Sequence, residues 1–241
     1  RGWKEADIVV VTGDAYVDHP AFGTAVISRV LEKNGYKVCI VSQPEKPEDF
    51  AVFGCPRLAF YVSSGNIDSM VAHYTVAKKP RTSDAYTPGG VMGKRPDRAV
   101  DVYCKKIRSV YGDIPIVIGG LEASLRRFAH YDYWSDSVRQ GILADAPANL
   151  LVYGMGERAL CEIAARLAAG VPASEIRDVR GTCYTMSIGE YRKSDITGTQ
   201  LPAYPVVSEK PTSLANGKVT LRYDATGAVS LLRSLPRAGE T

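Results

Sequence analysis

Long apolar runs, closely spaced cysteines and a large excess of one charge are all missing from this 241-residue sequence. No run approaches the roughly 20 apolar residues that a membrane-spanning helix needs, and we expect no signal peptide. The net charge of +4 is slight, so charge alone argues neither for nor against a nucleic-acid partner. The sequence therefore predicts a cytoplasmic protein without a membrane segment.

The cysteines are few and scattered, at Cys39, Cys55, Cys104, Cys161 and Cys183. No two of them have the spacing that metal or cluster ligands usually show, and their odd number does not suggest a disulfide framework. Buried, reduced thiols are the usual state of scattered cytosolic cysteines. We expect that state here, and no metal site in this chain.

The first part of the chain alternates short apolar runs with helix-period segments, a pattern typical of a parallel sheet covered on both faces. The sequence predicts an α/β fold over residues 1–172, doubly wound and Rossmann-like, with mainly parallel strands in flavodoxin-like order. Strands are expected at 8–11, 38–41, 58–62, 114–118 and 150–153. Helices are expected before Gly35, over 67–77, over 99–110 and from 157 to Gly170.

Residues 173–241 have a different pattern and predict an irregular C-terminal extension. An edge strand is expected within 179–186, and the stretch 201–216 reads as extended chain because it carries several prolines. A terminal hairpin is expected from strands at 219–223 and 229–232.

Polar residues at the strand ends are the candidates for a site, because ligands of open α/β sheets bind outside the carboxyl ends of the strands. The loop 12–20 contains Asp14, Asp18 and His19, which suit ligand binding or acid–base chemistry. Alternatively, one of the aspartates caps the next helix and His19 packs locally.

The later strand ends carry further candidates. Glycines there allow a ligand to approach the backbone, or they form tight turns with positive φ. The glycine pair before the last helix resembles half of a dinucleotide fingerprint, but the third glycine is missing. The candidates are Asn66 and Asp68 after the third strand, Gly119, Gly120 and Glu122 after the fourth, and Gly154, Gly156 and Glu157 after the fifth.

The segment 126–134 is the most unusual in composition. Arg126, Arg127, His130 and Tyr131 stand among further aromatics, a mixture that suits stacking together with anion or carboxylate recognition. The alternative is that the aromatics fill the core and the arginines are solvated. The basic loop 78–97 could likewise contact phosphate or RNA, or form a mobile solvated lid or a domain contact.

Because parallel strands all end on one side, we expect several of these side chains to surround one cleft at the carboxyl edge of the sheet. Such a cleft would suit a polar ligand or the docking face of another domain. The expected set is Asp14, His19, Asn66, Glu122, Arg126, Arg127, His130 and Glu157.

Long strings of this sequence resemble the YgiQ-type radical SAM family. They include TGDAYVDHP at 12–20, GGLEASLRR at 119–127 and HYDYWSD at 130–136, with shorter strings at 84–88, 93–98 and 176–180. In that family, this region is an N-terminal domain. A radical SAM barrel follows it and holds a [4Fe–4S] cluster on a Cys-x3-Cys-x2-Cys motif, and S-adenosylmethionine is the second cofactor of the full-length family. This chain lacks that motif, so we expect no cofactor in it and no catalysis by it alone.

A broader similarity is to cobalamin-binding Rossmann-like domains that precede other radical SAM barrels. There a Gly-Gly turn and a Gly-x-Gly-Glu turn shape the pocket, as the turns at 119–120 and 154–157 could here. One class of these domains ligates cobalt through Asp-x-His-x-x-Gly. The corresponding string at 18–23 is Asp-His-Pro-Ala-Phe-Gly. Its altered spacing argues against a cobalt ligand at His19, but not against cobalamin bound base-off without a protein ligand.

Two functional hypotheses follow. The first is an accessory domain that shapes substrate access for a radical SAM barrel downstream in the same polypeptide. The rival is a stand-alone module that binds RNA, a nucleotide or another polar small molecule. Continuation of the gene into a Cys-x3-Cys-x2-Cys barrel distinguishes the two.

The cysteine spacing predicts that the isolated chain purifies without a stoichiometric iron–sulfur cluster, even after anaerobic reconstitution. Iron analysis measures this directly. About four irons per chain, as one [4Fe–4S] cluster would give, lost on mutation of any one cysteine, would contradict the spacing argument.

Overall fold

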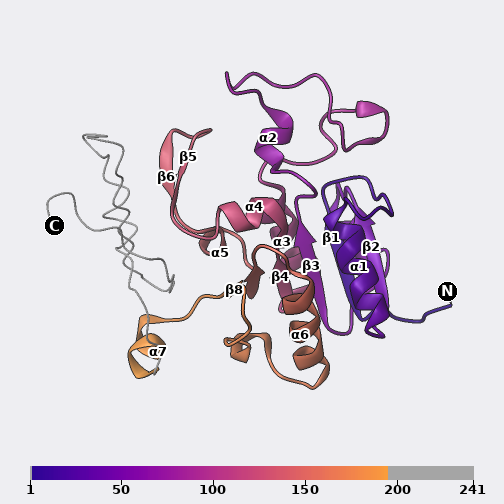
Figure 1. Cartoon of the computed structure of the whole chain (residues 1–241), viewed down its shortest axis with the longest axis vertical. Coiled ribbons are helices and arrows are strands. Elements are labelled where there is room, and N and C mark those ends of the chain that lie inside the picture. The colour runs from indigo at the N-terminus through magenta and orange to yellow at the C-terminus, as the bar shows by residue number, and fades with distance from the viewer. Residues whose placement is uncertain (1, 195–241) are drawn as a thin grey trace, which may run out of the picture.

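A six-stranded sheet in the order β2-β1-β3-β4-β7-β8 forms the centre of the computed structural model, which describes residues 2–194 (Figure 1). Strands β2, β1, β3, β4 and β7 are parallel to one another, and β8 is antiparallel to β7. This is the flavodoxin-like order, so the predicted doubly wound, mainly parallel α/β fold is confirmed. The strands are β1 (Ile8–Thr12), β2 (Val38–Ser42), β3 (Ala59–Ser63), β4 (Ile116–Ile118), β7 (Leu150–Val152) and β8 (Thr182–Cys183).

Three long helices cover the sheet: α1 (Gly23–Lys33), α3 (Ala99–Tyr111) and α6 (Glu157–Ala168). The remaining elements are short and most of them lie in the connections. They are η1 (Pro47–Ala51), α2 (Ser69–His73), η2 (Pro88–Gly90), α4 (Gly120–Leu125), the antiparallel hairpin β5 (His130–Asp132) and β6 (Ser137–Arg139), α5 (Ile142–Asp145), η3 (Ala173–Glu175) and α7 (Ile188–Lys193).

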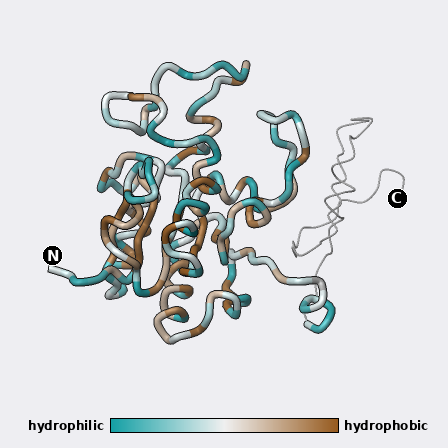
Figure 2. Tube along the Cα trace, turned by 180° about the vertical axis from the view of Figure 1, so that it is seen from behind, coloured by the Kyte–Doolittle hydropathy of each residue, from teal (hydrophilic) through white to brown (hydrophobic). Residues whose placement is uncertain are grey.

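The two faces of the sheet build two separate cores, because successive side chains of a strand point to opposite sides. On β1, Val9 and Val11 pack in the core that contains α3, whereas Ile8 and Val10 pack in the core that contains α1 and α6. Figure 2 shows the resulting concentration of apolar residues along the strands. Continuous apolar strands are therefore what this architecture requires.

The structure corrects several expected boundaries. The helix expected over 67–77 is only α2, because the backbone at Tyr74 is extended and forms a β-bridge to Pro80. Helix α4, which follows Gly119, and the β5–β6 hairpin were not predicted; both are too short to show a clear period. The strand β8 lies within the range where an edge strand is expected. The extended stretch at 201–216 and the terminal hairpin lie outside the described residues.

The basic loop between α2 and α3 is largely exposed to solvent, but a buried arginine anchors it to the sheet. The Arg95 side chain is 1% exposed. Its Nη1 donates to Asp14 Oδ1 and to the Ser64 carbonyl, both at 2.8 Å, and its Nη2 donates to both carboxylate oxygens of Asp84 at 3.0 and 2.8 Å. One guanidinium thus ties this loop to the ends of β1 and β3.

Two glycines allow the chain to close around this ion pair. A Cβ atom at Gly13 would lie 2.3 Å from the Ser64 carbonyl oxygen and 2.9 Å from Arg95 Cδ. Gly65 has φ of +107°, and a Cβ there would overlap the Asp14 carboxylate. Only glycine has both the space and the conformational freedom for this second position.

We predict that Arg95→Met destabilises the protein strongly, because Asp14 and Asp84 would remain buried without their cation. Removing one partner of a buried ion pair costs about 3–5 kcal/mol. Urea denaturation measures the change. The matched control is Lys94→Met, whose ion pair with Glu45 is exposed and should contribute about 0–1 kcal/mol. Equal losses for the two variants would contradict the anchoring role of Arg95.

Candidate functional site

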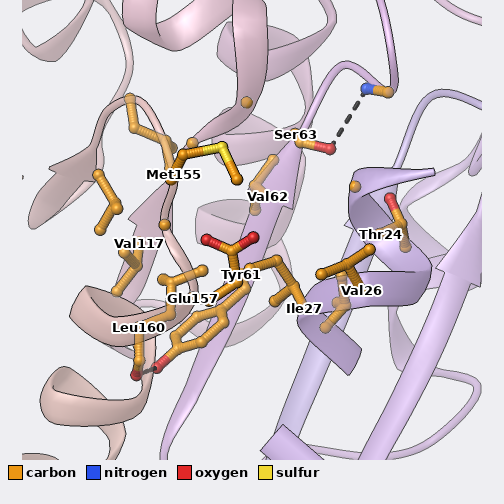
Figure 3. A pocket seen from close by; sticks show the side chains of 18 of the residues that line it. Thr24, Val26, Ile27, Tyr61, Val62, Ser63, Val117, Met155, Glu157 and Leu160 are labelled. Carbon is orange, nitrogen blue, oxygen red and sulfur yellow. Dashed lines mark hydrogen bonds between the residues drawn. The ribbon is translucent and has the colours of Figure 1, made fainter. Parts of the chain in front are cut away.

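A cavity of about 310 Å³ opens at the carboxyl edge of the sheet, between the sheet and the first turns of α1 and α6 (Figure 3). It lies beside β1 and β3, where the strand order reverses direction: the chain runs outward from β1 to β2 and then from β3 to β4 on the other side. Crevices at such switch points are the usual ligand sites of open α/β folds. The size lies at the lower end of the range for small-molecule pockets, about 300–1,000 Å³.

The floor and walls of the cavity are apolar. Val10, Val117 and Leu160 line it together with the ring of Tyr61. The Tyr61 hydroxyl donates to the Leu160 carbonyl at 3.0 Å, and burial raises the pKa of Tyr61 far above its usual value. The phenol is therefore neutral and already bonded, and it presents a flat apolar surface to a ligand.

The mouth of the cavity is built from glycine backbone. A Cβ atom at Gly119 would lie 3.2 Å from the Val152 carbonyl, and one at Gly156 would lie 3.2 Å from Val152 Cγ1. Gly120 has φ of +80° and Gly154 has φ of +70°, a region that side chains disfavour. These turns keep the mouth open for close approach of a ligand to the backbone.

Polar groups are sparse in the lining. Ser63, Thr24 and Glu157 contribute to it, and Ser63 Oγ accepts a hydrogen bond from Gly65 N at 3.2 Å. Figure 3 shows the Glu157 carboxylate projecting into the cavity, which the Tyr61 ring also lines. No other residue within 2–194 forms a hydrogen bond or ion pair with it.

Of the residues singled out from the sequence, Gly119, Gly120, Gly154, Gly156 and Glu157 line this cavity. The expectation that eight side chains share one cleft is wrong, because the other members are engaged elsewhere. Their ligand-binding role, and that of the five cavity residues, stays a prediction.

Asp14 and Asn66 support the rim of the cavity from behind. Asp14 Oδ2 accepts the Asn66 backbone N–H at 2.6 Å, and Asn66 Oδ1 accepts the Gly23 N–H at 3.2 Å. Burial raises the pKa of Asp14, although the Asn66 hydrogen bond and the Arg95 charge oppose this effect. These contacts join the loop after β3 to the first turn of α1.

Asp18 and His19 lie at the exposed surface. Asp18 forms an ion pair with Arg29, and His19 Nδ1 accepts the Ala21 N–H at 3.1 Å. The alternative that an aspartate caps α1 is also wrong, since Phe22 occupies the N-cap position without a side-chain hydrogen bond. Local packing of His19 is what the structure shows.

Glu122 and Asp68 satisfy the free N–H groups at helix starts. Glu122 is buried; its Oε2 accepts Ser69 N at 2.8 Å and its Oε1 accepts Val100 N at 3.1 Å. Asp68 is the N-cap of α2 and pairs with Arg126. Negative groups are favoured at helix N-termini. Because both carboxylates are used in these contacts, neither of them takes part in the lining of the cavity.

Arg126 and His130 line a second, far smaller cavity of about 20 Å³, which has room for about one water molecule. Burial lowers the pKa of both side chains, so His130 is neutral at pH 7. Arg127 lies over the Tyr153 ring with its Cζ 5.0 Å from the centroid, and Tyr131 is exposed with its hydroxyl bonded to Asp136. These residues are separate from the large cavity.

Tyr61, Thr24 and Met155 line the cavity but were not among the sequence candidates. The alternation along β3 could have indicated Tyr61, because every second residue of a strand faces the same side.

A second overlooked group lies beyond β3, where His73 Nδ1 and the Tyr74 hydroxyl contact the two oxygens of Asp97 at 2.5 and 2.7 Å. Attention to strand ends alone misses contacts between two segments of a long connection.

The five cysteines all lie within the described residues and none is in a disulfide. Cys104 is buried, but Cys55 is exposed, contrary to the expectation of burial. Within residues 2–194, no three histidine, cysteine, aspartate or glutamate side chains are grouped to hold a metal ion. In the same part of the chain, every helix is too short or too polar to cross a membrane.

A comparison with known protein families identifies the family of this chain. A family model described as Radical SAM N-terminal matches residues 1–231. The chain therefore belongs to the Radical SAM N-terminal family, and the relationship predicted from the sequence strings is confirmed.

The relatives within this family are named UPF0313 proteins. That of Methanosarcina mazei is 55% identical over 214 residues, covering 88% of this chain and 34% of the relative. That of Methanocella arvoryzae is 53% identical over 226 residues, covering 92% and 37% respectively. The chain thus spans about a third of the length of the curated relatives it matches.

One similar solved structure is the radical S-adenosylmethionine methyltransferase TsrM from Kitasatospora setae, with tryptophan substrate and a SAM analogue bound. The TM-score is 0.46 at 17% identity, over 73% of this chain and 28% of that chain.

The β5–β6 hairpin is held to the start of α3 by Asp132. Arg98 Nη2 donates to Asp132 Oδ2 at 2.7 Å, and Ser135 N donates to the same oxygen at 3.0 Å. Burial alone would raise the pKa of Asp132, but these hydrogen bonds lower it to about 2 from 3.8.

We predict that Asp132→Asn destabilises the protein at pH 7 by about 2 kcal/mol, since one pKa unit corresponds to about 1.4 kcal/mol. A lowered folded-state pKa contributes stability above the unfolded pKa. The difference between wild type and variant should therefore shrink as the pH falls from about 4 to about 2. Urea denaturation at several pH values measures it. Asp136→Asn, at an exposed position, is the control, with an expected change within about 0.5 kcal/mol; a pH-independent difference for Asp132→Asn would contradict the linkage.

Proposed function

We propose that this chain is the accessory domain of a radical SAM iron–sulfur protein, which holds a ligand at the carboxyl edge of its sheet and presents it to the rest of the polypeptide. The observation that carries the proposal is the 310 Å³ cavity with its glycine-lined mouth. Membership of the family and the greater length of the relatives support an arrangement in which a further domain follows.

Exposed apolar side chains beside the mouth supply a docking face. Leu121 and Leu125 project from α4, and Leu125 is 62% exposed. Met155, in the turn before α6, is 85% exposed and also lines the cavity. Contiguous apolar surface is a mark of interaction sites. A domain docked here would cover the mouth and meet the ligand.

In this proposal, the [4Fe–4S] cluster and S-adenosylmethionine belong to a barrel that follows this domain, as in the family that the sequence strings resemble. When bound there, they would supply the radical chemistry. The residues of this chain contribute the cavity, the rim and the docking face. The proposal includes a cytoplasmic location for the protein, because cluster-bearing enzymes of this type are expected to work there.

Cobalt ligation is not part of the proposal. The cavity does lie between the Gly-Gly turn and the Gly-x-Gly-Glu turn, where the cobalamin-binding resemblance puts a pocket. However, His19 does not line it, and His19 Nδ1 is occupied by the Ala21 N–H. The residues around the cavity therefore do not provide the histidine ligand of that class.

The rival hypothesis, an RNA- or nucleotide-binding module, depends on free cations in the loop 78–97. Arg95 is buried between two aspartates, Lys94 pairs with Glu45, and Lys78 lies over the Tyr133 ring. Arg98, just after the loop, pairs with Asp132. Lys79 and Arg81 have no acidic partner among residues 2–194, and Arg81 Nε donates to the Val71 carbonyl. Two unpaired cations are few for a phosphate backbone, which several Lys and Arg contacts usually bind, so the accessory-domain function is the one we propose.

We predict that, in the full-length protein, the backbone amides of α4 and of the turn 153–156 are protected from hydrogen exchange by the docked domain. Leu125→Asp should raise exchange at both segments about tenfold, because a charge on the docking face must be desolvated. Hydrogen–deuterium exchange with mass spectrometry measures it.

The matched control is Val52→Asp, at a residue that is 70% exposed and follows η1 on another part of the surface. It should leave both segments unchanged. Fast exchange at α4 and 153–156 in the unsubstituted full-length protein would rule out docking at this face.

A further inference from the structure

The carboxylate of Glu157 is the one charged group in the described lining of this mainly apolar cavity. Glu157 is the first residue of α6, and its side chain projects into the cavity that the Tyr61 ring also lines (Figure 3). Thr24, Ser63 and Tyr61 also line the cavity, but the structure shows no hydrogen bond from any of them to this carboxylate. Within residues 2–194, Glu157 has no partner of its own.

The part of the chain that the structure describes supplies no cation to this site. Among the described residues, no lysine, arginine or histidine lines the cavity. The nearest arginine along the helix, Arg158, is exposed, and Arg127 is stacked on Tyr153 outside the lining. A ligand that fills the cavity must therefore remove water from Glu157 while no cationic side chain of the described residues takes the place of that water.

A carboxylate that loses its water without gaining a partner is strongly unfavourable. A neutral hydrocarbon or an anionic ligand would impose that penalty, whereas a ligand with a protonated nitrogen would form a charge-assisted hydrogen bond. The remaining walls, made of Val10, Val117, Leu160 and the Tyr61 ring, favour an apolar and flat body. Charge and shape thus select the same class of molecule.

We propose that the cavity binds a small molecule with an apolar ring system and a protonated amine or similar nitrogen base, and that Glu157 is the residue that recognises the nitrogen. This inference rests on the proposed function, because it names the ligand class of the same cavity. The ring lies along Tyr61 and the β3–β4 face, and the nitrogen lies at the mouth beside α6.

Three probes with the same ring and different charge test the proposal: 1-naphthylmethylamine, 1-naphthalenemethanol and 1-naphthoate. Binding to the full-length protein is measured by calorimetry at pH 7. We expect the amine to bind at least about tenfold more tightly than the alcohol, and the carboxylate not to bind, since a charge-assisted hydrogen bond is worth about one to two orders of magnitude in affinity.

Two variants with matched controls complete the test. Glu157→Gln should weaken the amine at least about tenfold and leave the alcohol nearly unchanged, whereas Glu162→Gln, on the same helix and paired with Arg166, should change neither. Ala21→Trp, at an exposed position in the lining, should block all binding. Ala51→Trp, at an exposed residue at the end of η1, should not.

The outcomes separate this inference from the proposed function. Equal binding of amine and alcohol, with no effect of Glu157→Gln but with loss in Ala21→Trp, overturns recognition by Glu157 and leaves the ligand cavity intact. No binding of any probe overturns both. If the amine fails to bind and Glu157→Gln instead speeds hydrogen exchange at 153–156 in the full-length protein, a cation from the docked domain occupies the site, and the small-molecule inference is wrong.

Discussion

The buried guanidinium of Arg95 is the contact on which the arrangement of the carboxyl edge depends. It joins Asp14 after β1, the Ser64 carbonyl after β3 and Asp84 in the connection to α3. Burying three charges is favourable only when each is paired and its hydrogen bonds are satisfied. That requirement fixes the relative positions of three segments that are far apart in the sequence, and through Asn66 it also fixes the start of α1.

As a consequence, most charged side chains at this edge hold segments of the chain together and are not free to bind a ligand. Asp14 is bound to Arg95, Glu122 accepts the N–H groups at the starts of two helices, and Asp132 holds the β5–β6 hairpin to Arg98. The cavity beside them is apolar because the polar groups around it are already paired. Glu157 differs from these carboxylates: it faces the cavity and has no partner among residues 2–194.

The apolar cavity and the exposed apolar side chains near it fit the proposed role of this domain within its family. Glycines line the cavity, and exposed leucine and methionine side chains lie on α4 and in the turn before α6. Such an apolar surface is suited to being covered by another domain. The relatives are about three times as long as the matched region, and we propose that such a domain lies in the remaining length. A rigid cavity on this scaffold, held in place by the Arg95 contacts, would then present its ligand at a constant distance from the docked partner.

The sequence by itself determined the fold and the family. Continuous β-branched runs such as 8–11 are typical of strands buried between two helical layers, and long strings such as 119–127 identify relatives without any structure. The glycine turns and Glu157 were also visible, because strand ends are recognisable from where an apolar run stops.

What only the tertiary structure decided is which polar groups remain free. Asp14 and Glu157 look alike in sequence, each close behind a strand. Arg95, 81 residues away along the chain, neutralises the first, whereas nothing within 2–194 reaches the second, and pairing over such distances is set by packing and not by local pattern.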